Sequence, residues 1–153
     1  MKAEKAGTNS VAYGACGVVL GLFPTIFLFV FNIMVSSAKE TPHIIKMGYY
    51  VTALRSVWLI YMPIMIVIGV LYILSGWLIK NKNQKGIVVG ISASIFNLFW
   101  VAGYEVSLIF NVLPTFPGKF PPIEFQIIVF VIVAVIFCLY PVYFLLTFKR
   151  IEV

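Results

Sequence analysis

The sequence has few charged residues, and acidic ones are the scarcest. Only 10% of its 153 residues are charged, whereas soluble domains carry about 25%. The chain holds five glutamates, no aspartate and a single histidine. Catalysis within a membrane needs a nucleophile, a base or a metal set, and these residues form no such pattern. The shortage of charge predicts a surface that faces lipid, and it argues against an enzyme.

Cysteine motifs are also lacking. Cys16 and Cys138 each stand alone in an apolar run, without the CxxC or Cys/His spacing of zinc sites and thiol relays. We interpret both as small hydrophobic residues and expect neither a metal nor a cofactor. The formal charge of +6 is spread in short clusters between apolar runs, which suits anionic lipid headgroups. Because no basic face with interleaved aromatic residues exists, we expect no nucleic-acid partner.

Long apolar runs are what the sequence has instead, since 62% of its residues are hydrophobic. A helix that crosses a hydrocarbon core of about 30 Å needs about 20 apolar residues. Four runs meet this requirement, at residues 11–35, 56–79, 87–113 and 123–148. We therefore predict an all-α integral membrane protein, in which residues 1–153 form a single domain of four transmembrane helices packed as an antiparallel bundle.

Lysine and arginine are distributed unevenly between the two sides of this bundle. Seven lie beside the termini or in the turn between the second and third runs, and four lie on the other side. The first set is Lys2, Lys5, Lys80, Lys82, Lys85, Lys149 and Arg150, and the second is Lys39, Lys46, Arg55 and Lys119. Because cytoplasmic loops are enriched in basic residues, we predict a multi-pass protein with both termini in the cytoplasm.

Small residues inside the runs predict where the helices pack closely. In lipid, helices associate where small side chains let their backbones approach. A tight turn between the second and third runs would place Gly76 opposite Gly90. In the same register Gly69 falls opposite Asn97. The predicted packing residues are Gly14, Gly17, Gly21, Gly69, Gly76, Gly90 and Ser94.

Glu105 is the one acidic residue well inside an apolar run. It lies about 27 Å along the third helix from Ile87, at about 1.5 Å per residue. This places it near the outer boundary of a core about 30 Å thick. The helical period puts it on the face that carries the small residues of this run, so we expect it to point inward. Tyr61 lies opposite and Arg55 further out, and we predict that one of them ties Glu105 to the second helix.

With Asn97, which lies near the midplane, these residues make up a predicted polar cluster. Its members are Glu105, Arg55, Tyr61 and Asn97. If Glu105 is a structural tie between the two helices, Glu105→Gln should lower the thermal stability of the protein. The alternatives are a functional carboxylate and a side chain that faces the headgroups. For Asn97 we expect an interhelical hydrogen bond.

The segment LPTFPGKFPP, residues 113–122, contains four of the eight prolines and predicts a stiff loop. Its residues Phe116, Pro117 and Phe120 are candidates for contact with a partner subunit. The simpler alternative is that the loop contacts no partner and only dips into the lipid headgroups.

The lack of catalytic patterns and the glycine-rich faces favour a small non-catalytic membrane protein. We expect an accessory, assembly or scaffold subunit of a membrane complex. Its partners would be the lipid bilayer and either another membrane protein or copies of the same chain. The alternative is an oligomeric channel or small-solute transporter that uses Glu105, Arg55 and Asn97. A membrane-embedded enzyme is the third possibility.

Overall fold

The computed structural model describes residues 2–37, 42–115 and 123–151, and this part of the chain is almost entirely helical. The main helices are α1 (Ala3–Ser37), α2 (Pro42–Lys80), α3 (Lys85–Ser107) and α4 (Ile123–Thr147). A π-helical turn and a 3₁₀ turn follow α3, and another 3₁₀ turn follows α4. These turns are Leu108–Val112, Leu113–Thr115 and Phe148–Arg150.

Each main helix includes or contributes to a segment long and apolar enough to cross a membrane. The segments are Ala3–Pro24, Val51–Lys80, Lys85–Val112 and Val131–Arg150. The predicted set of four membrane-length helices is therefore confirmed. The first two helices begin earlier than their apolar runs, at Ala3 and Pro42 rather than at residues 11 and 56. Main-chain hydrogen bonding continues through polar residues, so an apolar run marks less than the whole helix.

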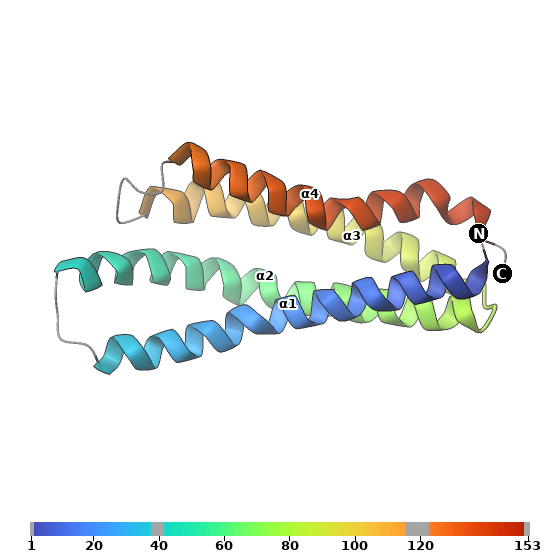
Figure 1. Cartoon of the computed structure of the whole chain (residues 1–153), viewed down its shortest axis with the longest axis horizontal. Coiled ribbons are helices and arrows are strands. Elements are labelled where there is room, and N and C mark those ends of the chain that lie inside the picture. Colours follow the sequence, from blue (N-terminus) through green and yellow to red (C-terminus); the bar gives the residue numbers. More distant parts are fainter. Residues whose placement is uncertain (1, 38–41, 116–122, 152–153) are drawn as a thin grey trace.

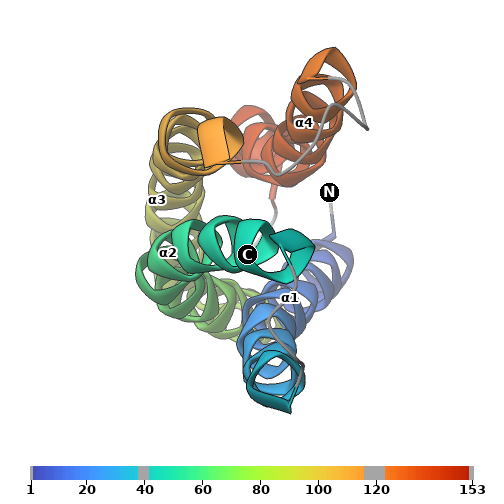
Figure 2. The same cartoon turned by 90° about the vertical axis from the view of Figure 1, so that its left-hand side faces the viewer.

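The helices lie side by side, with α2 between α1 and α3, and with α4 against α3 (Figures 1 and 2). The termini and the turn between α2 and α3 gather at one end (Figure 1). α1 and α4 approach each other at that end and diverge toward the other (Figures 1 and 2). The closed half, at the end with the termini, comprises residues 3–18, 65–97 and 137–151. The open half comprises residues 19–37, 42–64, 98–115 and 123–136.

A seam of glycines at seven-residue spacing joins α1 to α2. Gly7 packs against the backbone of Gly76, and Gly14 packs against that of Gly69. A Cβ atom on Gly69 would lie 2.7 Å from the carbonyl oxygen of Gly14. Gly21 continues the same seam along α1. Because no side chain fits between the two backbones, only glycine allows the helices to pack this closely.

This glycine seam corrects the register predicted from the sequence. Gly76 and Gly69 face α1, rather than Gly90 and Asn97 of α3. A spacing of seven residues keeps small residues on one face of a helix over successive turns. Gly7 belongs to the same series, although it lies before the first apolar run. The seam therefore begins in a part of α1 that the hydropathy pattern leaves out.

Gly90 has a different role, because it lets α3 contact two neighbouring helices at one point. A Cβ atom there would lie 2.7 Å from Oγ of Ser75 on α2 and would overlap the ring of Phe144 on α4. Phe144 is almost fully buried. The missing side chain thus lets an aromatic ring of α4 reach the contact between α2 and α3.

Candidate functional site

Tyr13 of α1 ties three helices together in the closed half. Its hydroxyl donates to the main-chain carbonyl of Phe137 on α4 at 2.8 Å. The same hydroxyl accepts a hydrogen bond from the side-chain amide of Asn97 on α3, also at 2.8 Å. The Phe137 carbonyl lacks its usual helical donor, because Pro141 four residues later has no N–H. Tyr13 therefore satisfies a carbonyl that the proline leaves free.

Tyr72 of α2 begins a second chain of hydrogen bonds, which runs into α3. Its hydroxyl donates to Ser94 Oγ at 2.9 Å, and Ser94 donates to the carbonyl of Gly90 at 2.8 Å. Closer to the turn between the two helices, Ser75 donates to the carbonyl of Gly86 at 2.7 Å. Both sets of bonds hold α2 against α3 at positions where glycine allows close approach.

Three tyrosine rings, Tyr13, Tyr72 and Tyr140, meet in the closed half and form a tyrosine cluster. Tyr13 stacks on Tyr140 with ring centroids 4.5 Å apart. Tyr72 meets these two rings edge-on, at 5.0 Å and 5.5 Å. The hydroxyl of Tyr140 shares a hydrogen bond with Ser10 of α1 at 2.6 Å. Sequence reasoning missed this cluster, whose only sequence signal is that Tyr72 and Tyr140 lie well inside apolar runs, whereas Tyr13 lies near the start of one.

The buried polar side chains of the described residues share one feature. They are Ser10, Ser75, Ser94 and Asn97. Each of them makes a hydrogen bond to a helix other than its own. Asn97 also keeps one buried atom, Oδ1, without a hydrogen-bond partner within the described part of the chain. The polar interior of the closed half is thus used mainly to join helices.

A second aromatic group lies in the open half. Trp100 and Tyr104 of α3 are stacked, with ring centroids 5.1 Å apart and planes inclined by 7°. The indole N–H of Trp100 donates to the carbonyl of Tyr61 at 2.7 Å, and that of Trp58 donates to the Tyr104 hydroxyl at 3.1 Å. These bonds run between α2 and α3, so they fix both rings of the stack against α2.

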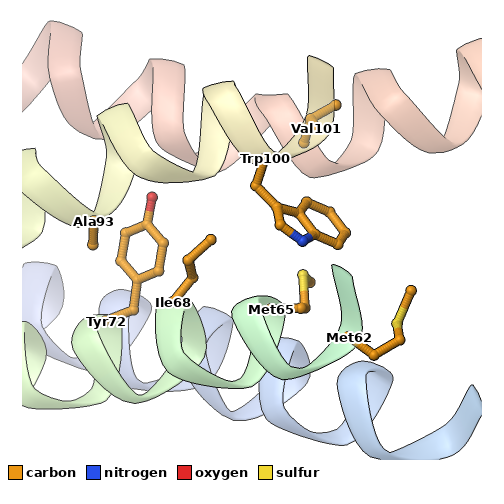
Figure 3. Packing of buried hydrophobic residues seen from close by; sticks show 7 residues of the cluster. All are labelled: Met62, Met65, Ile68, Tyr72, Ala93, Trp100 and Val101. Atoms are coloured by element: carbon orange, nitrogen blue, oxygen red, sulfur yellow. The ribbon is translucent and has the colours of Figure 1, made fainter. Parts of the chain in front are cut away.

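A cavity of 170 Å³ adjoins the stacked pair, and every helix contributes two side chains to its wall. The lining residues are Leu20 and Pro24 of α1, Met62 and Met65 of α2, Trp100 and Tyr104 of α3, and Val133 and Phe137 of α4. Figure 3 shows Trp100 extending from α3 toward α2, where Met62 and Met65 lie. The wall carries no charged side chain, and the cavity lies where α1 and α4 begin to diverge.

Glu105 does not make the contacts predicted for it. It is half-buried, and its Oε1 atom is buried without a hydrogen-bond partner among the residues that the structure describes. Arg55 is exposed, and the Tyr61 hydroxyl bonds to Ser107 at 2.8 Å instead. Glu105 is therefore not tied to α2 through Tyr61, and its side chain points away from that residue.

The helical phase of α3 explains this direction. Tyr61 lies against Gly103 and bonds to Ser107, so these two residues mark the face of α3 that meets α2. Glu105 is two residues from each of them, which is about 200° around the helix. The sequence-based register placed Tyr61 opposite Glu105, whereas the structure turns the carboxylate to the other side.

The predicted polar cluster is thus not assembled as one site. Asn97 bonds to Tyr13 in the closed half, and Tyr61 bonds to Ser107 in the open half. The predicted contact residues of the loop, Phe116, Pro117 and Phe120, lie outside the described residues. Among the residues that are described, no three histidine, cysteine, aspartate or glutamate side chains gather as a metal site.

Comparisons with known proteins add no relative to this description. The chain matches no protein-family model, no curated protein and no solved structure. The functional interpretation therefore depends on the closed half, the cavity and Glu105.

Proposed function

We propose that the protein is an integral membrane protein whose four helices cross the bilayer as an antiparallel bundle, with both termini in the cytoplasm. The length and apolar character of the helices support this. So does the excess of basic residues, seven against four, on the side of the termini.

Single cysteines in a cysteine-free background test the orientation. A thiol reagent that cannot cross membranes should label Lys119→Cys in intact cells. It should label Lys82→Cys only after the membrane is permeabilised. The reverse pattern would contradict the proposed orientation.

We further propose that the role is non-catalytic, as an accessory, assembly or scaffold subunit of a membrane complex. The main observation in support of this role is that each buried polar side chain of the described residues bonds to another helix. Polar groups are costly inside a membrane, and they serve either substrate paths or helix contacts. A polar interior used for helix contacts supports a structural role.

α4 is the helix best placed to contact a partner subunit. Only 11% of the most apolar 18-residue stretch of this segment is buried, against 33% to 39% of the corresponding stretches in the other three segments. Its exposed residues include Val135, Leu139 and Leu146. This face suits a helix of another membrane protein, because the chain itself leaves it uncovered along much of the span.

Purification from the native membrane in mild detergent tests this role. We expect a stoichiometric membrane-protein partner. Leu139→Trp should reduce its recovery by about tenfold, the loss expected when one central contact is disrupted. Val88→Trp, on an exposed position of α3, serves as the matched control and should retain the partner. Recovery of the chain alone, or equal loss in both variants, would contradict the proposal.

A second candidate function, an oligomeric channel or small-solute transporter, is favoured by Glu105, whose Oε1 atom is buried and has no hydrogen-bond partner among the described residues. Ionisable residues at membrane depth commonly mark substrate or ion pathways. Four helices make a thin wall, so a channel would need several copies of the chain. Flux into liposomes that Glu105→Gln abolishes, together with a cross-linked homo-oligomer, would support this function over the accessory role.

A further inference from the structure

The cavity of the open half has a buried floor and an exposed rim. Met62 and Met65 of α2 and Trp100 of α3 form the floor, and all three are buried. Leu20 of α1 also lines the cavity, but 47% of its surface is exposed. On this side α1 and α4 diverge (Figures 1 and 2). The cavity therefore opens between these two helices, toward the surroundings of the protein.

Those surroundings are lipid hydrocarbon, a step that rests on the membrane insertion proposed above. Trp100 lies about 20 Å along α3 from Ile87, at about 1.5 Å per residue. A hydrocarbon core of about 30 Å leaves about 10 Å to the boundary on the side away from the termini. Phe23 and Ile136, which adjoin lining residues in the chain, are apolar and exposed. The mouth of the cavity thus meets the acyl chains of that leaflet rather than headgroups or water.

The wall of the cavity offers no polar partner to an occupant. The indole N–H of Trp100 donates to the carbonyl of Tyr61, and the hydroxyl of Tyr104 accepts a bond from Trp58. The other lining side chains are aliphatic, methionine or phenylalanine. Water needs about two to four polar partners, and a ligand with polar groups at the wall would lose hydrogen bonds without replacement. The cavity therefore selects a hydrocarbon group.

The size of the cavity fits a segment of an acyl chain. Its volume is 170 Å³, and an engineered apolar cavity of about 150 Å³ holds benzene, a molecule of six carbons. Met62 and Met65 are unbranched and adapt to irregular shapes, whereas Trp100 is fixed by its hydrogen bond. A chain segment here gains dispersion contacts with side chains of all four helices.

We propose that the open half binds one acyl chain of a membrane lipid. The middle of the chain enters between α1 and α4 and lies against Met62, Met65 and Trp100, and the headgroup stays at the boundary away from the termini. The lipid joins α1 to α4 in the open half, as the tyrosine cluster does in the closed half. This site is separate from the outer face of α4 that we propose for a partner subunit.

Tryptophan fluorescence in bilayers tests the proposal. The probe is phosphatidylcholine with bromine atoms at the middle of its acyl chains, because bromine quenches a tryptophan that it contacts. The chain has three tryptophans, and the double variant Trp58→Phe, Trp77→Phe leaves only Trp100. Because Trp100 is buried, a chain must enter the cavity to reach it. We expect Trp100 to lose most of its emission, compared with the same lipid without bromine.

A filled cavity provides the matched comparison. Val133→Phe, added to the double variant, occupies the cavity and should restore most of the emission of Trp100. Val135→Phe makes the same enlargement at an exposed position outside the cavity and should leave the quenching unchanged. Leu20→Phe replaces Val133→Phe if that variant does not fold. Equal quenching in the filled variant and in Val135→Phe would overturn the site.

A lipid-facing tryptophan separates failure of the site from failure of membrane insertion. Phe99 precedes Trp100 in α3, and 75% of its surface is exposed. Phe99→Trp, with the three native tryptophans changed to phenylalanine, should be quenched with or without Val133→Phe. Quenching at this position but not at Trp100 would overturn the lipid site alone, and quenching at neither would also overturn the proposed insertion. Quenching of Trp100 by bromobenzene but not by the brominated lipid would assign the cavity to a small aromatic molecule and overturn the acyl chain.

Discussion

The closed and open halves use polar and aromatic side chains in different ways. In the closed half, tyrosines from α1, α2 and α4 contact one another, and their hydroxyls bond to other helices. In the open half, the hydrogen bonds of Trp58, Trp100 and the Tyr61 hydroxyl run between α2 and α3. These bonds do not reach α1 or α4, and a cavity lined by side chains of all four helices adjoins the stacked rings of Trp100 and Tyr104. In the closed half the tyrosine hydroxyls thus connect all four helices, whereas these hydrogen bonds of the open half connect α2 with α3.

The largest expected effect is on the glycine seam that supports the closed half. We expect Gly14→Ala to lower the free energy of unfolding by about 3 kcal/mol, near the upper end of overpacking costs. The new Cβ atom would overlap main-chain atoms of Gly69, and these cannot rotate away as a side chain can. Equilibrium unfolding in mixed SDS micelles measures this difference.

Gly17→Ala is the matched control on the same helix. A Cβ atom there would lie 3.5 Å from the nearest atom, the Cα of Gly69, which is an ordinary contact. Both variants gain the same helix propensity, about 1 kcal/mol, so their difference isolates the steric term. Equal stability of the two variants would show that the seam is not as tight as described.

The next largest effect concerns the bonds of the tyrosine cluster. Tyr13→Phe keeps the ring but removes the hydroxyl that bonds Asn97 and the Phe137 carbonyl. We expect a loss of about 1–2 kcal/mol, since single hydrogen bonds inside membrane proteins contribute about 0.6 kcal/mol on average and two buried groups lose their partner. The same unfolding assay measures it.

Thr147→Val is the control for Tyr13→Phe. It also removes one hydroxyl, but among the described residues that hydroxyl bonds within its own helix, to the carbonyl of Tyr143. Its effect on stability should be within about 0.5 kcal/mol, as for most surface substitutions. A loss as large as that of Tyr13→Phe would contradict the view that bonds between helices close this half.

The sequence allowed the four helices to be predicted, because an apolar run of about 20 residues is long enough for a helix to cross a bilayer and too long for a strand. It also identified most glycines of the seam as packing residues. It did not identify their partners, because the spacing of Gly69 and Gly76 defines a face of α2 but not the neighbour that covers it. That neighbour is α1, through Gly14 and Gly7.

The candidate site was predictable only in part, for the same reason. Helical phase placed Glu105 on an inward face, but its partner depended on how α2 is rotated about its own axis. A shift of about two residues between α2 and α3 is enough to change the partner of Tyr61 from Glu105, as predicted, to Ser107, as observed. The tyrosine cluster left no periodic signal, because its members come from three helices and meet only after those helices have packed.

In the open half, a smaller loss is expected when a hydroxyl is removed. Tyr61→Phe breaks a single hydrogen bond to Ser107, between two half-buried side chains. We expect a cost of about 0.6 kcal/mol, the average for one such bond in a membrane protein, which is below that of Tyr13→Phe. Ser107→Ala removes the same bond from the other side and should match it. A cost above that of Tyr13→Phe would mean that the open half is held together as firmly as the closed half.

The last expected effect on stability concerns Glu105 and is the only one that is not a loss. A structural tie to α2 would make Glu105→Gln destabilising, but Oε1 has no partner to lose among the described residues. We expect the free energy of unfolding to stay unchanged or rise by up to about 1 kcal/mol, since the neutral amide is less costly to bury than a carboxylate. Thermal unfolding in detergent without added ligand measures this, with Glu4→Gln as the exposed control. A clear drop in the melting temperature of Glu105→Gln alone would show that the carboxylate holds the open half together, and the two halves would then differ less than their hydrogen bonds indicate.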